Sequence, residues 1–401
     1  MNSDPVQAPQ PLAGLRVVEF THMVMGPTCG MVLADMGAEV IKVEPLGGDR
    51  TRYLLGSGAG FFPLFNRNKR SIAIDLHTSE GVALAQQLAV SADVVVENFK
   101  ADTPIKYGLD YPTLNALNPR IIYAAHKGFL PGPYDHRTAL DEVVQMMGGL
   151  AYMTGRPGDP LRAGTSVNDI MGGMFGAIGV LGALVQRGIT GKGMEVQSAL
   201  FENNVLLMGQ HMLQYAVTGQ AAAPMPTRIS AWGVYDVFDV KDGEQIFLAA
   251  VSDAQWRVFC GVLGLTDLLA DPTLATNNQR VQARPGLQKV LQQRLAHRSA
   301  AELAQLMERA GLPFAPIRKP EELLSDEHLL ATGGLANVEL PDGAHAGQTV
   351  KTTLLPITMQ GQRLGVRSSP PRLGQHTQGV LAGIGYAPDA IEDLRMRHIV
   401  G

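Results

Sequence analysis

Residues 15–44 read LRVVEFTHMVMGPTCGMVLADMGAEVIKVE, and this stretch decides the fold class. Two β-rich runs, Leu15–Phe20 and Glu39–Glu44, flank a predicted helix over Pro27–Met36, where Pro27 suits the first helical turn. Val and Ile fill both runs without alternating with polar residues, as strands buried on both faces require. The stretch therefore predicts a strand–helix–strand unit within a parallel sheet.

The alternation of strand-like and helical segments continues to about residue 200. Three further strands are predicted in the first part, at Ser71–Asp75, Asp93–Glu97 and Arg120–Ala125. A helix is predicted between the first two of them, at Thr78–Ala92. Beyond Thr138 the chain becomes mainly helical, with helices expected at Leu140–Tyr152, Asp169–Arg187 and Ala199–Val217. This order of elements predicts an α/β fold in which helices cover an open, mostly parallel sheet.

A different pattern begins after residue 220. The stretch Ala221–Pro226 is proline-bearing, as linkers are, and Asp242-Gly243 lies between the β-rich runs Val234–Val240 and Gln245–Val251. Asp-Gly between two such runs is a strong signal for a β-hairpin. Helices are expected after it at Asp253–Leu263, at Gly286–His297 and from Ser299, where Glu302 completes the spacing of a capping box.

These changes in composition predict three parts of the chain. The first, over 1–220, is a large domain, and the second, over 221–332, is a small domain with its linkers. A proline-rich stretch over Leu312–Pro320 ends the small domain, and a glycine- and proline-rich tail over 333–401 closes with a helix near Pro388–His398.

The composition limits the class of protein. The chain has 401 residues, of which 45% are hydrophobic and 17% charged, so a large core is available and global disorder is excluded. Its net charge of −4 gives no reason to expect nucleic acid as a partner. Two cysteines, Cys29 and Cys260, cannot form a disulfide framework or a four-ligand zinc site, so no metal site is expected.

Neither a membrane nor a secretion route is indicated. The first residues, MNSDPVQAPQ, lack the basic region and apolar stretch of a signal peptide. The most apolar segment, Ile170–Val185, is shorter than the ~20 residues that a membrane span needs, and we interpret it as a buried helix. A cytoplasmic protein without a membrane partner is therefore expected.

Nucleotide-binding motifs are missing where this fold would place them. The turn after the first strand, over residues 21–27, reads THMVMGP and lacks the GxGxxG fingerprint, and no GxxxxGK[ST] run occurs. An enzyme that uses nicotinamide or ATP is therefore disfavoured. The basic run NRNKR over residues 66–70 is either a solvated loop or a contact to phosphate.

Asp169 has the most informative position of the acidic residues. It precedes a glycine-rich apolar helix, and its simplest role is that of an N-cap, which needs no function. The same position favours an ionised carboxylate in apolar surroundings, because a helix N-terminus stabilises negative charge. Glycines at 172, 173, 176, 179 and 182 would let a ligand or another backbone come close. A desolvated carboxylate there is a reasonable nucleophile toward an activated acyl group, and spacing alone leaves both roles open.

Seven short motifs occur in a fixed order along nearly the whole chain. They are LAGLRVVE (12–19), GP (26–27), LADMGAEVIKVE (33–44), NKRS (68–71), DVVVENF (93–99), TGKG (190–193) and GLPFAP (311–316). Together they resemble the class III CoA-transferases, the family of formyl-CoA:oxalate and carnitine CoA-transferases. The resemblance implies a Rossmann-like large domain built from both ends of the chain, a smaller inserted α+β domain, and a homodimer whose subunits interlock.

The resemblance also implies that Asp169 is the catalytic carboxylate, since it starts the matching Asp-x-x-x-Gly apolar helix. In that chemistry the carboxylate attacks a donor thioester, and an aspartyl-CoA thioester then passes CoA to an incoming acid. Coenzyme A thioesters are substrates of this reaction, so no permanently bound cofactor is expected. Water must be excluded, because it would hydrolyse the activated intermediates.

Seven side chains match positions at which the family contacts CoA. They are His22, Lys69, Arg70, Asn98, Phe99, Lys106 and Lys127. The cationic members suit the CoA phosphates. Structural alternatives stay open, with His22 as an ordinary residue at a helix start, Asn98 as the end of a strand and Phe99 as part of the core.

Several positions depart from formyl-CoA transferase. Apolar residues over Met23–Met25 stand where that enzyme has a glutamine, Phe129 replaces a tyrosine, and Thr227–Trp232 replaces a tetraglycine lid. These differences argue against oxalate and formate as the natural acids. The resemblance instead favours succinyl-CoA as donor and a dicarboxylate-like acceptor such as glutarate, itaconate, mesaconate or 3-sulfinopropionate. A second anionic group would need a cation, for which the candidates are His22, Arg50, Arg52 and Arg228.

Two other functions are compatible with much of the sequence. An α-methylacyl-CoA racemase shares the fold, but it needs two acid/base groups, and Leu140 stands where those enzymes have a histidine. A non-catalytic acyl-CoA-binding protein is the other alternative, and the presence of Asp169 argues against it. The sequence thus favours transfer over racemisation.

Overall fold

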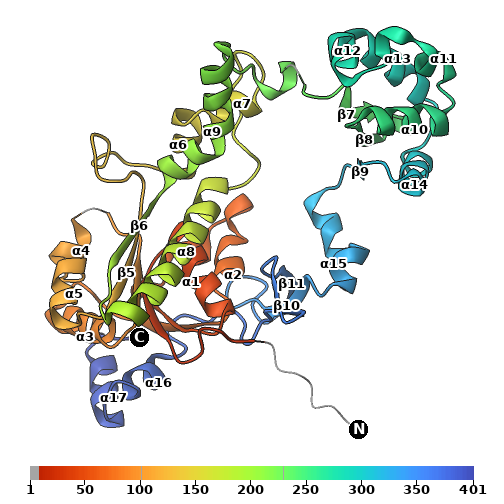
Figure 1. The fold of residues 1–401 in the computed structure, drawn as a ribbon. Helices are drawn as coiled ribbons and strands as arrows, with labels where there is room; N and C mark the ends of the chain where they lie inside the picture. Colours follow the sequence, from red (N-terminus) through yellow and green to blue (C-terminus); the bar gives the residue numbers. More distant parts are fainter. Residues whose placement is uncertain (1–8, 101, 229) are drawn as a thin grey trace. The chain divides into compact units, whose positions relative to one another are not determined.

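The computed structural model describes residues 9–100, 102–228 and 230–401. The chain divides into two compact units (Figure 1). Unit 1 comprises Met1–Pro224 together with Glu327–Gly401, and unit 2 comprises Met225–Asp326. The sequence predicts a small domain over 221–332, whereas unit 2 ends at Asp326. Residues 327–332 therefore belong to unit 1 and not to the small domain.

A six-stranded sheet forms the centre of unit 1. Its strands are β1 (Arg16–Phe20), β2 (Glu39–Glu44), β3 (Lys69–Ala73), β4 (Val94–Glu97), β5 (Ile122–Lys127) and β6 (Glu195–Ala199). Every neighbouring pair is parallel, and the order across the sheet is β3-β2-β1-β4-β5-β6. The predicted α/β fold with a mostly parallel sheet is confirmed. The sequence prediction lacks β6, because this edge strand is short, partly exposed and poor in β-branched residues.

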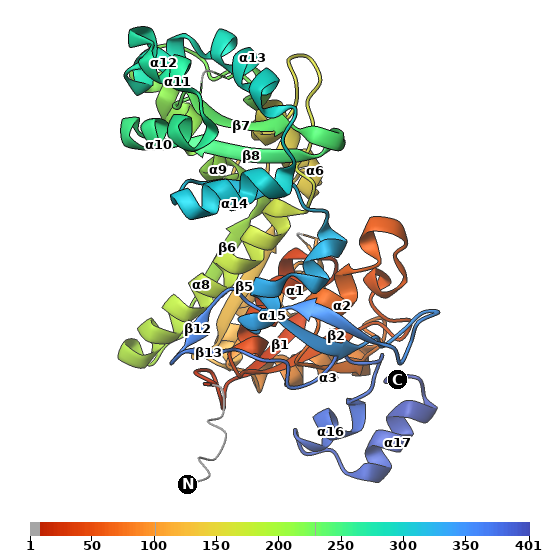
Figure 2. The same ribbon diagram turned by 90° about the vertical axis from the view of Figure 1, so that its right-hand side faces the viewer.

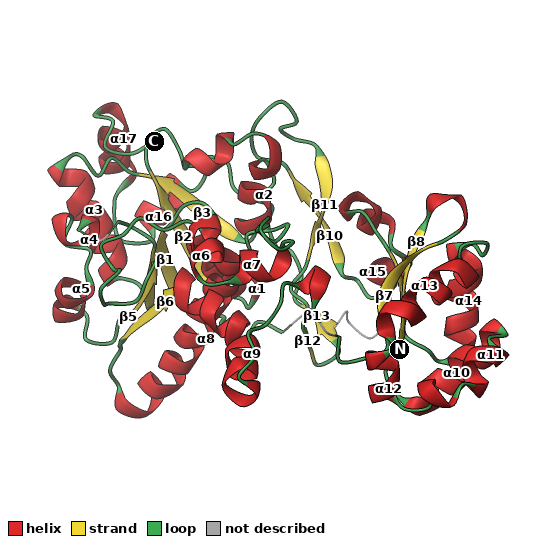
Figure 3. Ribbon diagram, turned by 90° about the horizontal axis from the view of Figure 1, so that it is seen from above, coloured by secondary structure: helices red, strands yellow, loops and turns green. Residues whose placement is uncertain are grey.

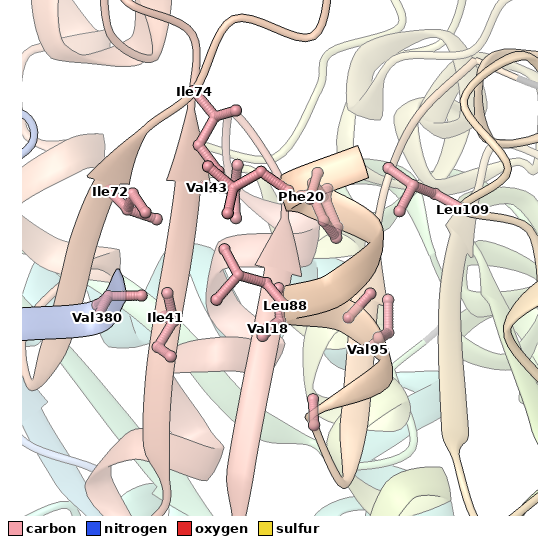
Figure 4. Packing of buried hydrophobic residues seen from close by; sticks show 14 of the residues in the cluster. Val18, Phe20, Ile41, Val43, Ile72, Ile74, Leu88, Val95, Leu109 and Val380 are labelled. Atoms are coloured by element: carbon pink, nitrogen blue, oxygen red, sulfur yellow. The ribbon is translucent and has the colours of Figure 1, made fainter. Parts of the chain in front are cut away.

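One face of the sheet is covered by helices from both ends of the chain. These are α3 (Ser79–Val90), α5 (Tyr111–Leu117), α16 (Thr377–Ala382) and α17 (Pro388–Met396). Figure 4 shows part of the core between them and the strands, with Leu88 of α3 and Val380 of α16 near Val18 and Ile41. Because Val380 belongs to this core, the C-terminal segment is an integral part of unit 1.

The opposite face is covered by α1 (Met25–Asp35) and α8 (Val167–Thr190). Successive strand residues point to opposite faces, so Val17 and Val40 pack here while Val18 and Ile41 pack on the other side. Both faces of β1 and β2 are therefore buried. This explains why their sequences show continuous apolar runs rather than alternation.

α8 is, in the described part of the chain, the one helix long and apolar enough to cross a membrane by length and composition alone. It extends over more residues than the apolar core expected at Ile170–Val185. Its inner side packs on α1, β5 and β6, and Figure 2 shows it running beside β6. A Cβ atom on Gly173 would lie 2.4 Å from the Met25 carbonyl oxygen, and one on Gly176 would lie 2.2 Å from His126 Nε2. These glycines let α1 and β5 approach closely, so α8 is a partly buried core helix.

The helix predicted over Leu140–Tyr152 is two helices, α6 (Asp141–Met147) and α7 (Leu150–Thr154). They are separated at Gly149, whose φ of +88° lies in the left-handed region and interrupts the helix. After β6 the chain continues into α9 (Leu200–Thr218), which confirms the helix predicted at Ala199–Val217.

Unit 2 contains a three-stranded antiparallel sheet in the order β7-β8-β9, with β7 (Val234–Asp239), β8 (Gln245–Ala250) and β9 (Phe314–Pro316). The predicted hairpin is confirmed, since Asp242 and Gly243 adopt φ values of +62° and +75° in the turn between β7 and β8. The accompanying helices are α10 (Asp253–Leu263), α11 (Thr266–Ala270), α12 (Asn277–Gln282), α13 (Arg284–Leu295) and α14 (Ala300–Ala310).

The capping box predicted at the start of α14 is only half formed. The Ser299 hydroxyl accepts a hydrogen bond from the Glu302 backbone N–H at 3.1 Å. The Glu302 carboxylate pairs with Arg298 at 2.9 Å instead of returning to the cap backbone. A nearby guanidinium therefore competes successfully with the backbone N–H for this carboxylate.

The remaining elements are short. Unit 1 contains α2 (Phe61–Phe65), α4 (Thr103–Lys106), α15 (Glu327–Ala331) and the 3₁₀ turns η1 (Arg50–Tyr53) and η2 (Gly56–Gly58). Its C-terminal part adds two antiparallel pairs, drawn as strands in Figure 3: β10 (Leu335–Glu339) with β11 (Thr349–Thr353), and β12 (Thr358–Met359) with β13 (Gln362–Arg363).

Candidate active site

The order of the strands reverses between β1 and β4, because β2 and β3 lie on one side of β1 while β4, β5 and β6 lie on the other. In open parallel sheets, ligands bind beyond the carboxyl ends of the strands at such a switch point. Four of the predicted CoA contacts lie there: His22 after β1, Asn98 and Phe99 after β4, and Lys127 at the end of β5. The topology thus brings together residues that are up to about a hundred positions apart.

The loop after β1 is held by side chains from three other segments. The Asn98 side-chain carbonyl accepts from the His22 backbone N–H at 3.0 Å, and its amide donates to the His22 carbonyl at 2.8 Å. The buried Lys42 ammonium donates to the Thr21 carbonyl at 2.7 Å, and the Met23 N–H donates to Thr51 Oγ1 at 2.9 Å. Both polar groups of Asn98 are therefore engaged with the loop backbone.

This loop contains a backbone conformation that is unusual for its residue type. Met23 has a φ of +61°, in the left-handed region that a side chain disfavours. The hydrogen bond from the Met23 N–H to Thr51 and those between the His22 backbone and Asn98 hold this conformation in place. As a result the side chains of His22 and Met23 are exposed at the switch point.

Lys127 is a cation at the same place. Its ammonium lies 2.7 Å from Glu97 Oε1, and its side chain retains 25% of its exposure. Burial raises the pKa of Glu97, and the Lys127 charge opposes that shift.

Phe99 is half-buried and packs on Phe20, with 5.8 Å between ring centroids. Lys106, at the end of α4, is exposed and lies 5.1 Å from the centroid of the Tyr107 ring.

Two predicted phosphate contacts lie elsewhere. Lys69 is buried, and its ammonium donates to Glu19, to the Pro27 carbonyl and to Asn66 at distances between 2.8 and 3.1 Å. Arg70 forms an ion pair with Glu39. Both residues lie at the amino ends of their strands, whereas the switch point lies beyond the carboxyl ends. Lys69 is therefore not part of a solvated loop, and Arg70 is not part of the switch point.

Asp169 lies in the first turn of α8, at the third helical position, and is half-buried. Ser166 occupies the N-cap position and makes no side-chain capping bond. The interpretation of Asp169 as an N-cap is therefore wrong. Asp141, at the start of α6, takes over the capping role: its Oδ2 accepts from the backbone N–H of Asn168 at 2.7 Å and of Asp169 at 3.2 Å.

The carboxylate of Asp169 is left without a hydrogen-bond donor among the residues that the structure describes. Burial and, after it, the charge of Asp141 raise the pKa of Asp169 to about 7. A carboxyl group tuned close to neutral pH is typical of catalytic sites. Asp141 is not among the site residues predicted from the sequence, although an acid at the start of a predicted helix could have indicated it.

α1 begins next to this acid. On the adjacent turn of α8, a Cβ atom on Gly172 would lie 2.4 Å from Met25 Cε. The N-cap residue of α1, Val24, makes no side-chain capping bond, and the N–H groups of Met25 and Gly26 donate to no group in residues 9–100, 102–228 and 230–401. These N–H groups and the positive end of the α1 dipole suit an anion or a developing oxyanion.

The chain is similar to several known proteins. The family model of CoA-transferase family III matches residues 12–377. A succinate–glutarate CoA-transferase of Agrobacterium fabrum is 35% identical over 385 residues, which cover 93% of this chain and 95% of that protein. A succinyl-CoA:glutarate CoA-transferase of Mus musculus is 33% identical over 396 residues, covering 96% and 89% respectively. The crystal structure of a CaiB/BaiF family protein from Brucella suis superimposes with a TM-score of 0.82 at 33% identity, covering 94% of this chain and all of that one.

Proposed function

Since the chain belongs to CoA-transferase family III, we propose that this class III CoA-transferase moves CoA from succinyl-CoA to a second dicarboxylate-like acid, with Asp169 as the attacking group. The observation that carries the proposal is the state of the Asp169 carboxylate: half-buried, free of hydrogen bonds within the described residues, and with a pKa raised to about 7. Such a carboxylate needs little desolvation before it attacks a carbonyl carbon.

The reaction proceeds through exchange of acyl groups on Asp169. Its carboxylate oxygen attacks the thioester carbon of the donor, the C–S bond breaks, and a mixed anhydride and CoA thiolate result. The thiolate then attacks the Asp169 acyl carbon, which releases the donor acid and leaves an aspartyl-CoA thioester. The acceptor carboxylate attacks that thioester, and the same two steps run in reverse to give the new acyl-CoA. No proton or external energy source is consumed.

Residues at the switch point would bind the CoA moiety. We assign Lys127 and Lys106 to the phosphates, because both retain exposed positive charge near the carboxyl ends of the strands. Phe99 offers part of an aromatic face. His22 contacts the ligand through its exposed side chain, while Asn98 acts on the loop backbone. Lys69 and Arg70 are left out of this assignment because Lys69 is fully buried against Glu19 and Arg70 lies at the amino ends of the strands, away from the switch point.

The second carboxylate of the acids requires a cation that is free to bind it. Arg52 is fully buried and pairs with Glu44 at 2.7 Å and with Asp342 at 2.5 Å, so its guanidinium is already engaged. Arg228 lies in unit 2 and donates to the Met225 carbonyl at 2.6 Å. Arg50 is exposed and precedes Thr51, which holds the loop after β1. Desolvation lowers the pKa of His22 and so disfavours its cationic form. We therefore assign the second carboxylate to Arg50.

A homodimer is part of this proposal. The outer side of α8 exposes Met174, Phe175, Ile178, Val185 and Ile189, and α9 exposes Leu206, Met212, Leu213, Tyr215 and Val217. Exposed apolar residues in this number indicate a surface that another protein covers. We propose that a second copy of the chain covers it and that the enzyme acts in the cytoplasm. Sedimentation equilibrium of the purified protein tests the dimer, and a monomer at micromolar concentration would contradict it.

Substrate specificity is tested by incubating the purified enzyme with succinyl-CoA and a panel of acids. Glutarate, itaconate, mesaconate and 3-sulfinopropionate should accept CoA, whereas acetate and butyrate should not. Transfer to monocarboxylates alone would contradict the assignment of a second carboxylate site.

A separate incubation tests the alternative of a racemase. A chiral 2-methylacyl-CoA in deuterated water should show no α-deuterium exchange, because exposed Leu140 offers no base.

A further inference from the structure

Asp141 forms a second carboxylate centre beside Asp169, contributed by a different helix. It is buried, and its Oδ2 accepts two backbone N–H groups at the start of α8. Its Oδ1 accepts from the side-chain amide of Gln145, which is also fully buried. Three N–H donors and a helix N-terminus favour the ionised form of a carboxylate. Asp141 is thus a fixed negative charge next to the attacking acid.

The surrounding segment is held by the same two residues of α6. While the Gln145 amide donates to Asp141, its carbonyl accepts from the Ala163 N–H at 2.8 Å. Residues 163–169, which lead into α8, are therefore attached at both ends to α6. The position of Asp169 relative to Asp141 is set by backbone hydrogen bonds, so the two charges cannot move apart without breaking them.

We propose that Asp141 is a positioning residue that places Asp169 and, through its negative charge, favours every state in which the Asp169 carboxylate is neutralised. This inference rests on the proposed role of Asp169 as the attacking group. Protonation and acylation both remove the charge of Asp169, so both relieve the same repulsion. A nearby charge that raises the pKa of Asp169 by one unit should therefore favour the acylated enzyme about tenfold.

Other charged groups near α8 do not account for this effect. The elements packed against α8 include α1, α6, α9, β5 and β6. Besides Asp141 they carry Cys29, Asp35, Glu142, Glu202, His211, Tyr215, Tyr123, His126, Lys127 and Glu195. Among the described residues, the causes that raise the pKa of Asp169 are burial and, second, the charge of Asp141.

The test compares Asp141→Asn with wild-type enzyme in two measurements. The first is the pH dependence of single-turnover acylation by succinyl-CoA, whose acid limb should move down by on the order of one pH unit. The second is the equilibrium between free enzyme and aspartyl-CoA adduct without acceptor, quantified by mass spectrometry. The adduct fraction should fall, and the logarithm of the change in its equilibrium constant should match the shift of the acid limb.

Matched variants separate charge from structure. Asp141→Ser keeps an acceptor oxygen without the charge and should reproduce the shift, which also covers the case in which Asp141→Asn fails to fold. Asp141→Glu keeps the charge and should leave the acid limb near its wild-type position even if the rate falls. Glu142→Gln removes the adjacent acid, which pairs with Arg162 on the exposed side, and should change neither measurement.

The inference is overturned if Asp141→Asn and Asp141→Ser both show the wild-type acid limb and adduct equilibrium. That outcome differs from failure of the proposed mechanism. If Asp169→Asn retained transfer activity, the attacking role of Asp169 would be lost, whatever Asp141 does. A wild-type profile in the Asp141 variants together with an inactive Asp169→Asn variant would remove only the role of Asp141.

Discussion

Two groups of acidic residues in unit 1 have opposite surroundings. Glu19, Glu44 and Asp49 lie among the buried cations Lys42, Lys69 and Arg52. Burial alone would raise the pKa of Glu44, but Arg52 and Lys42 outweigh it and hold that pKa below its usual range. Asp169 is half-buried beside Asp141, with no cation opposite it among the described residues, and its pKa rises.

The difference shows what separates a structural acid from a reactive one. Acids of the first group accept hydrogen bonds from their cations and keep the sheet and the loop after β1 in place. Each is held in an ion pair with a buried cation, so none is available to attack a ligand. Asp169 has free lone pairs, and desolvation with a like charge makes its negative form less stable. In these two groups, the charge of the neighbours decides whether an acid is held in an ion pair or left reactive.

The largest expected effect is on the reactive member of this comparison. Asp169→Asn, Asp169→Ser and Asp169→Ala should each lower transfer activity by about 10⁴-fold or more, because none of the three side chains supplies an attacking carboxylate. Steady-state assays with succinyl-CoA and glutarate measure the loss. Wild-type enzyme incubated with donor alone should give an aspartyl-CoA adduct on the peptide that contains Asp169, and hydroxylamine should trap this adduct. Transfer activity in the Asp169→Asn variant would contradict this mechanism.

The next largest effect is on the structural group. Lys69→Met should lower the free energy of unfolding by about 3 kcal/mol or more, since Glu19 would keep only Lys42, 3.8 Å away. Urea denaturation measures this change. Arg70→Met is the matched control, and loss of its partly exposed ion pair should cost less than about 1 kcal/mol. An unchanged stability with a raised KM for acyl-CoA would instead make Lys69 a phosphate contact.

A smaller effect should appear in the pH dependence of stability. The folded-state pKa of Asp169 is about 7, against an ordinary value of 3.8. Between these values the folded protein holds a proton that the unfolded chain releases, so wild-type stability falls as the pH rises through this window. Asp169→Asn avoids that loss and should be more stable than wild type at pH 8 by on the order of 2 kcal/mol, after allowance for partial exposure.

Urea unfolding at pH 4 and pH 8 checks this prediction. The stability difference between Asp169→Asn and wild type should shrink toward zero below pH 4. Asp159→Asn, at an exposed acid, should show no such pH-dependent gain. A gain of the same size at both pH values would mean that the charge of Asp169 is not its cause.

The smallest effect is expected at Lys127. Lys127→Ala should raise the KM for acyl-CoA about five- to tenfold with little change in kcat, because a contact to a remote phosphate is the same in ground state and transition state. Lys192→Ala, beyond the opposite end of α8 from Asp169, is the control and should leave KM unchanged. An equal loss of kcat and kcat/KM in the Lys127 variant would place this residue in the chemical step.

Local sequence predicted most of the regular elements of both units. The apolar runs identified β1 to β5, and the Asp-Gly pair identified the hairpin of unit 2, because burial on both faces and positive φ values restrict residue type directly. β6 and the break between α6 and α7 were not predicted. The first has too little apolar character, and the second depends on a left-handed Gly149 inside an otherwise helical pattern.

For the site, the sequence predicted Asp169 and the lysines as candidates but not Asp141, and the role of each residue depends on the packing around it. Lys69 and Lys127 are both lysines in suggestive motifs, but the fold seals one against Glu19 and leaves the other partly exposed at the switch point. The sequence allows Asp169 to be a helix cap, but the cap of α8 is Asp141 on α6, which accepts hydrogen bonds from the first N–H groups of α8. Charge state and availability depend on neighbours distant in the chain, and only the packing of helices and strands brings those neighbours together.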